Sequence, residues 1–138
     1  MFSNIDYSNP EVREDVLRWG QWMVQDVGVD GFRLDAVPHY SWRFTKEWVG
    51  QARKAASQQQ RELLILGEYW MKDVNKLVRW VDNVGQGVKA IDAPLHANFA
   101  RLSQAKGRWE ADLRKVYRDT LTAARPNNAV VSNPVLGL

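Results

Sequence analysis

The chain has 138 residues, 45% of them hydrophobic and 7 of them tryptophan, which is enough for one domain with a buried core. It contains no cysteine, so disulfides, thiolate metal ligands and thiol catalysis are excluded. The formal net charge is +3, but basic and acidic side chains are interspersed, which is typical of a solvated surface. Because the charges are mixed, we expect no nucleic-acid partner. No apolar stretch approaches the length of a membrane span, so we also expect no membrane partner.

The N-terminal part of the chain predicts a loop and then a helix. Residues 1–9 are polar and lack the charged and apolar regions of a signal peptide, which together with the absent cysteine slightly favours a cytoplasmic location. Asn9 is a good helix cap and Pro10 suits the first helical position. Apolar residues then recur at helical spacing from Val12 to Met23, so a helix is predicted there.

Two short apolar segments follow, and each predicts a buried parallel strand. The first covers residues 29–37, directly after Gly28, and the second covers residues 63–67. Between them a helix is predicted to begin after Ser41, and after them another helix is predicted to begin after Asp73.

The remaining segments continue the alternation. We predict a strand over 88–93, a short helix from Pro94, a helix over 109–124 and the start of a strand over 129–131. Alternating strands and helices are typical of a parallel α/β sheet. A closed eight-stranded barrel needs about 250 residues, so the chain is expected to supply about half of one.

Two of the predicted strands end on an acid, Asp35 and Glu68, at the end of the strands where α/β folds place their chemistry. Arg33 precedes Asp35 by two residues, so its guanidinium points the same way and keeps the carboxylate ionised, as a nucleophile requires. Glu68 is followed by Tyr69 and Trp70, and a carboxyl among aromatic rings is desolvated and suited to donate a proton.

The spacing of neighbouring strands favours a particular chemistry for this pair of acids. Adjacent strands lie about 4.7–4.9 Å apart, close to the 5–5.5 Å that separates the carboxyls of retaining glycosidases and below the roughly 6.5–9.5 Å of inverting ones. Taken singly, Asp35 is more often a cap or turn former, and Glu68 could simply pair with Arg33. Taken together, the three residues favour a catalytic site.

The residues that carry these acids resemble a known family. Residues 31–37 (Gly-Phe-Arg-Leu-Asp-Ala-Val) and 67–70 (Gly-Glu-Tyr-Trp) closely resemble the fourth and fifth barrel strands of α-amylases in glycoside hydrolase family 13. Of the flanking segments, residues 6–12 resemble the loop before the third helix, and residues 125–130 resemble the approach to the seventh strand. Residues 92–99 resemble the exit of the sixth strand in the liquefying-type and intracellular amylases. The resemblance implies a partial (β/α)8 TIM barrel, with strands four to six and the start of seven, in one partial catalytic domain over residues 1–138.

The resemblance also implies roles for individual residues. Asp35 would be the nucleophile and Glu68 the general acid/base of a retaining hydrolysis of internal α-1,4-glucosidic bonds in starch or glycogen. Arg33 would orient Asp35 and, with His39 and Trp70, line the cleft that binds the α-glucan. Calcium is the implied cofactor, with Asn4 and the backbone carbonyl of His39 as its candidate ligands.

Three departures from the family pattern lower the expected activity. Pro38 stands where the family usually has lysine, so the cation for an acceptor sugar is missing. Asn4 stands where the family often has a calcium-binding aspartate, so we expect weaker calcium binding. The third catalytic aspartate, in an Asn-His-Asp motif after the seventh strand, has no counterpart after residues 131–133. We therefore expect a central fragment of an amylase that is weakly active or inactive as this chain.

Two alternatives remain open. The first is another family 13 α-glucan enzyme such as a transglycosylase, although Tyr69 and Trp70 favour the amylases. The second is a degenerate, non-catalytic glucan-binding protein, which Pro38 and the absent third aspartate favour. His96 follows a proline on a predicted helix, where a packed or surface role is the more common one.

Overall fold

The fold is one parallel sheet with helices between successive strands. The computed structural model describes residues 5–85, 87–105 and 112–131. The strands lie in the order in which they occur in the sequence: β1 (Gly31–Leu34), β2 (Leu64–Gly67), β3 (Lys89–Ile91) and β4 (Ala129–Val130). All three pairings are parallel. This arrangement confirms the predicted α/β class and is consistent with part of a barrel.

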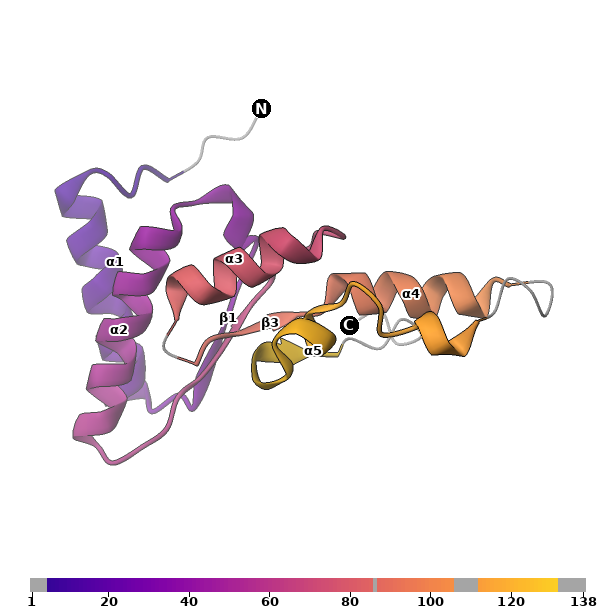
Figure 1. The fold of residues 1–138 in the computed structure, drawn as a ribbon. Coiled ribbons are helices and arrows are strands. Elements are labelled where there is room, and N and C mark those ends of the chain that lie inside the picture. Colours follow the sequence, from indigo (N-terminus) through magenta and orange to yellow (C-terminus); the bar gives the residue numbers. More distant parts are fainter. Residues whose placement is uncertain (1–4, 86, 106–111, 132–138) are drawn as a thin grey trace.

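The helices follow one another along the sheet. They are α1 (Pro10–Trp22), α2 (Trp42–Gln58), α3 (Val74–Val84), α4 (Ala93–Ser103) and the short α5 (Leu121–Ala124). In Figure 1, α1 and α2 lie side by side and α4 projects away from them beyond the far end of the sheet. Among the described residues, β1 and β4 each pair with one neighbour, so each leaves one strand edge open.

The helix starts agree with the predicted caps. The side chains of Asn9, Ser41 and Asp73 accept hydrogen bonds from backbone N–H groups two residues ahead, at 3.0, 3.2 and 3.0 Å. Each satisfies a donor that the first helical turn leaves free. After α1 the chain makes a single π-helical turn over Met23–Val27 and stops at Gly28, whose φ of 82° glycine adopts without strain.

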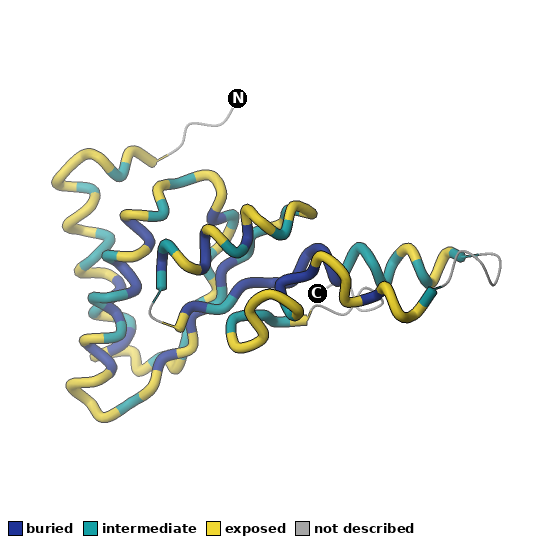
Figure 2. Tube along the Cα trace, viewed as in Figure 1, coloured by how far each residue is buried: buried dark blue, intermediate teal, exposed yellow. Residues whose placement is uncertain are grey.

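The core lies where α1, α2 and α3 pack on the sheet. Figure 2 shows the buried positions concentrated in the strands and in the facing turns of α2 and α3. The indole of Trp48 joins three elements, since its Nε1 donates to the Val16 carbonyl at 3.1 Å and its ring meets Phe32 edge-on at 4.9 Å. Ile65 in β2 and Leu77 in α3 are fully buried in the same cluster.

Two predicted strands are shorter than expected. Over residues 29–37, β1 ends at Leu34 because Ala36 is left-handed (φ 46°) and residues 37–39 form a 3-10 turn. Over residues 88–93, β3 ends at Ile91 because the next side chain, Asp92, already caps α4 through Leu95 N at 3.0 Å.

The predicted helix over 109–124 is wrong in its described part. Residues 113–115 form a 3-10 turn, and Asp119 adopts a left-handed φ of 55°, which interrupts a helix. Thr120 then caps the separate helix α5 by accepting from Ala123 N at 3.2 Å. The first three residues of that range lie outside the described part of the chain.

Gly67 offers a test of how β2 is packed. A Cβ at this position would lie 2.9 Å from Cζ3 of the buried Trp80 and nearer still to its Cη2. We expect Gly67→Ala to lower the free energy of unfolding by about 1–3 kcal/mol, as overpacking does, measured by chemical denaturation. As a control, Gly50→Ala in α2 should leave that free energy unchanged or raised, because alanine is the better helix former. Equal stability of Gly67→Ala and the parent chain would contradict this packing.

Candidate active site

The register of β1 and β2 brings the two predicted catalytic acids to one edge of the sheet. Leu34 lies opposite Gly67, so the next residues of the two strands, Asp35 and Glu68, leave the sheet together. The backbone holds this exit in place, because Glu68 N donates to Leu34 O at 2.8 Å and Val37 N donates to Glu68 O at 3.2 Å. The strand register and these two backbone hydrogen bonds therefore bring the two acids close together, as predicted.

A single guanidinium joins the two carboxylates. Arg33 Nη1 lies 2.6 Å from Asp35 Oδ1, and its Nη2 lies 2.8 Å from Glu68 Oε1. Such charge-assisted contacts fix both the distance and the orientation of a carboxylate. The structure therefore shows the expected contact with Asp35 and also the ion pair with Glu68 that sequence reasoning weighed as an alternative.

A strained turn supplies the second contact to Glu68. Ala36 is a non-glycine residue in the left-handed region (φ 46°, ψ 43°), a conformation that costs on the order of 1–2 kcal/mol. In this conformation its N–H donates to Glu68 Oε2 at 3.1 Å. Both oxygens of Glu68 are therefore held, and its side chain is only 26% exposed, whereas Asp35 is 73% exposed. The two acids thus differ in how freely they meet a ligand.

The aromatic residues after Glu68 pack on the helices. The Tyr69 ring tilts against Trp80 of α3 at 6.0 Å, and the Trp70 ring meets His96 of α4 edge-on at 4.9 Å. Trp70 remains 52% exposed. The contacts that fix the Glu68 carboxylate are the polar ones from Arg33 and Ala36.

Tyr40 is a site residue that sequence reasoning missed. It lines a cavity of about 260 Å³ together with Arg33 and Asp35 and with the core aromatics Phe44 and Trp48. Burial, together with the nearby Tyr7 and Asp35, raises the pKa of Tyr40 to about 12. Its position immediately after His39 was the available signal, since the loops that follow the strands line such sites.

Of the two candidate metal ligands, His39 lies in the described part of the chain. His39 is exposed and lines a hollow of about 470 Å³ with Asp6 and Ser8. Asp6 Oδ1 already accepts from Ser8 N at 2.9 Å and from Ser8 Oγ at 2.6 Å, contacts that lower the pKa of Asp6. Asn4 lies outside the described residues.

The described residues do not fit a calcium ion. Within them, no three His, Cys, Asp or Glu side chains cluster as metal ligands. Calcium takes six to eight oxygen ligands, whereas the hollow beside His39 offers one carboxylate that is already hydrogen-bonded. No chemical step is therefore assigned to a metal.

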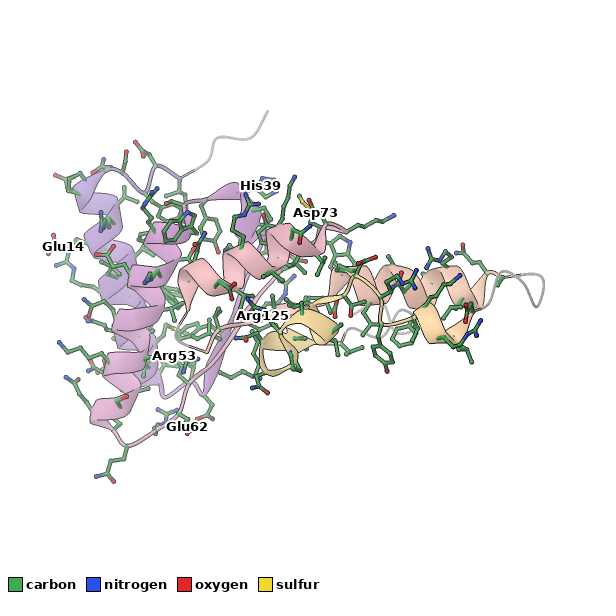
Figure 3. The ribbon with its side chains drawn as sticks, viewed as in Figure 1. Glu14, His39, Arg53, Glu62, Asp73 and Arg125 are labelled. Atoms are coloured by element: carbon green, nitrogen blue, oxygen red, sulfur yellow. The ribbon has the colours of Figure 1, made fainter. Side chains whose placement is uncertain are left out.

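The predicted site residues thus fall into three places. Arg33, Asp35 and Glu68 are in contact at the ends of β1 and β2. His39 lines the hollow beside Asp6, and Trp70 lines a separate groove beside α4. Figure 3 shows His39 at the same end of the molecule as Asp73, with Glu62 at the opposite end.

Barrel enzymes place their active sites at the carboxyl ends of the strands, and most glycoside hydrolases use a pair of carboxyl groups, so the acid pair of this chain is of the kind that glycoside hydrolases carry. The family described as "Alpha amylase, catalytic domain" matches residues 2–136 of this chain. The chain belongs to that α-amylase family.

Individual relatives agree with this assignment. The chain is 36% identical over 130 residues to an α-amylase of Geobacillus stearothermophilus, which covers 94% of this chain and 23% of the relative. It is 37% identical to a cytoplasmic α-amylase of Escherichia coli (strain K12), covering 94% of this chain and 25% of the relative. The chain thus spans about a quarter of the length of the curated relatives it matches.

Solved structures share the fold. A crystal structure of an Anoxybacillus α-amylase superposes with a TM-score of 0.65 at 22% identity, over 83% of this chain and 24% of that one. The partial barrel predicted from the sequence is therefore confirmed. No helix in the described part of the chain is both long enough and apolar enough to cross a membrane.

The raised pKa of Tyr40 predicts a loss of stability in alkali. The phenol titrates near 10 in the unfolded chain and near 12 in the folded one, so the unfolded chain releases its proton first as the pH rises. The contribution of the neutral phenol is therefore complete below about pH 10 and is lost as the pH rises to about 12. Chemical denaturation at a series of pH values should show that the free energy of unfolding falls less between about pH 10 and 12 for Tyr40→Phe than for the parent chain. The exposed Tyr117 gives the control, since Tyr117→Phe should follow the parent; identical curves for Tyr40→Phe and the parent would contradict the assignment.

Proposed function

We propose that this chain carries the central part of an α-amylase catalytic domain, which hydrolyses internal α-1,4-glucosidic bonds of starch or glycogen with retention of configuration. The observation that carries the proposal is the pair of acids, Asp35 and Glu68, held by one guanidinium at the carboxyl edge of a parallel sheet. The names of the relatives support the same activity, since both are α-amylases. Residues 1–138 are proposed to belong to one domain.

The proposed chemistry uses the two acids in different roles. A carboxylate oxygen of Asp35, the more exposed acid, forms a bond to the anomeric carbon while the bond from that carbon to the glycosidic oxygen breaks. Glu68 gives its proton to the departing oxygen. Water then attacks the anomeric carbon, its proton passes to Glu68, and the bond to Asp35 breaks.

The remaining site residues position these groups. Arg33 contacts both carboxylates and so sets the distance between nucleophile and acid. Trp70, which lines the groove beside α4, offers an exposed ring for contact with a sugar, and His39 is proposed to contact the glucan from the hollow beside Asp6. Misplacing either acid would cost rate even where the acid itself is kept.

The expected turnover of these 138 residues is low. They span about a quarter of the length of the matched relatives, so most of an α-amylase cleft is formed by segments they do not include. The third catalytic aspartate expected from the family has no counterpart in this sequence, and removal of one such electrostatic stabiliser of the transition state costs on the order of 10²–10³ in rate. A cytoplasmic location is also proposed, in line with the name of the Escherichia coli relative.

The first test of this function is hydrolysis of soluble starch, followed by the appearance of reducing ends. We expect the parent chain to release reducing ends slowly. Asp35→Asn and Glu68→Gln should release none above background, because each substitution removes a carboxyl group on which the chemistry depends. Glu62→Gln is the matched control, since Glu62 is exposed and lies at the opposite end of the molecule from His39 (Figure 3). It should release reducing ends at the parent rate.

Two outcomes would contradict the proposal. Release that survives both acid substitutions would show that these acids are not catalytic. Binding of starch without any release, by the parent chain as well, would support the non-catalytic glucan-binding alternative. The configuration of the first product, read by NMR, tests retention directly.

Weak calcium binding is a second part of the proposal, because the described residues supply few oxygen ligands and Asn4 carries no charge. We expect the midpoint of thermal unfolding to be nearly the same in millimolar calcium and in chelator. Asn4→Asp adds a charged oxygen and should make the midpoint rise with calcium, whereas Asn75→Asp on α3 should not. A large calcium-dependent rise in the parent chain would contradict weak binding.

A further inference from the structure

A groove beside α4 combines an aromatic surface with two cations. It has a volume of about 490 Å³ and lies between the segment after β2 and one face of α4. We call it the Trp70 groove, and its lining includes Trp70, Lys72, His96, Arg101 and Gln104. Of these five residues, the sequence predicted a substrate contact for Trp70 alone.

The aromatic wall of the groove is held in place and open to solvent. His96 meets the edge of the Trp70 ring at 4.9 Å with an interplanar angle of 63°, which limits the rotation of both rings. Trp70 is nevertheless half-exposed. His96 Nδ1 is buried and has no hydrogen-bond partner in the part of the chain that the structure describes. A flat ring beside polar atoms suits the apolar face and hydroxyls of a sugar.

The charged walls of the groove carry an excess of positive charge. Lys72 comes from the segment after β2 and Arg101 from the last turn of α4, and among the described residues no acid lines the groove. Within residues 5–85, 87–105 and 112–131, Arg101 donates to Asn98 Oδ1 at 3.2 Å, and its guanidinium carries further N–H groups that can donate to a ligand.

Two acids that are close in sequence to residues of the groove have hydrogen-bond partners elsewhere. Asp73 follows Lys72, but its carboxylate caps α3 through Asn75 N. Asp92 is fully buried, and its oxygens accept from Leu95 N at 3.0 Å and from Thr122 N and Oγ1, both at 2.7 Å. Both carboxylates keep their negative charge, but their oxygens are bound to other groups and neither residue lines the groove.

We propose that the Trp70 groove binds a phosphate monoester carried by an α-glucan, with a glucose ring on Trp70 and the phosphate between Lys72 and Arg101. The proposal rests on the proposed function for the glucan part and goes beyond it by naming the substituent. A phosphate monoester carries a charge of about −1.5 to −2 at neutral pH, which matches two cations better than one carboxylate does. Mixed charges elsewhere on the chain argue against a nucleic acid as the occupant.

Calorimetric titration of the intact chain tests this site without requiring turnover. The probes are a neutral maltohexaose, the same oligosaccharide with a 6-phosphate on one ring, and inorganic phosphate. We expect the phosphorylated sugar to bind at least about tenfold more tightly than the neutral one, as charge-assisted hydrogen bonds provide. Inorganic phosphate should bind more weakly than the phosphorylated sugar, because it lacks the ring contact.

Variants separate the two parts of the site. Lys72→Gln/Arg101→Gln should abolish the preference for the phosphorylated sugar and leave the affinity for maltohexaose unchanged, whereas Trp70→Ala should weaken both sugars. The matched control is Lys54→Gln/Arg79→Gln, which removes two exposed cations of α2 and α3 outside the groove and should preserve the preference.

Three results would overturn the proposal. They are equal affinity for the two sugars, a preference that survives removal of both groove cations, and inorganic phosphate bound as tightly as the phosphorylated sugar. Glu68→Gln distinguishes this proposal from the hydrolytic one, since it should abolish release of reducing ends but retain the preference for phosphate.

Discussion

The contact of Arg33 with two carboxylates is the interaction on which the site depends. Asp35 and Glu68 leave adjacent strands at one edge of the sheet, where like charges would repel each other. The guanidinium lies between them and holds one oxygen of each at 2.6 and 2.8 Å. The strained turn at Ala36 holds the second oxygen of Glu68. One acid is thus fixed and partly buried while the other remains open, so the two differ in how freely each meets a ligand.

The scaffold explains why this contact forms. The parallel register places Leu34 opposite Gly67, and Gly67 must lack a side chain because Trp80 of α3 occupies that space. On the other side of the site, Trp48 links α1, α2 and β1 through one hydrogen bond and one ring contact. The position of the acids is therefore determined by helix packing as well as by the strands, and a change in the core can alter the site without touching either acid.

Family membership and chain length bear on different questions. The match over residues 2–136 assigns the chain to the α-amylase family, and the fold agrees with solved members. The chain covers about a quarter of its relatives, and in the described part both outer strands of the sheet have an open edge. A barrel closes such edges by pairing its first strand with its last. The chemistry at the ends of β1 and β2 and the cations of the Trp70 groove are local, and so they can be tested on this chain.

Local signals in the sequence determined the helix caps, the order of strands and helices, and the identity of the two acids with their cation. Caps such as Asn9 act within two residues, and the alternation of apolar runs depends only on nearby positions. The end of β1 at Ala36, the break before α5, the role of Tyr40 and the pairing of Trp70 with His96 were decided by the tertiary structure. Each of these depends on contacts between residues far apart in the sequence or on a backbone conformation that packing imposes, and neither leaves a periodic pattern in the chain.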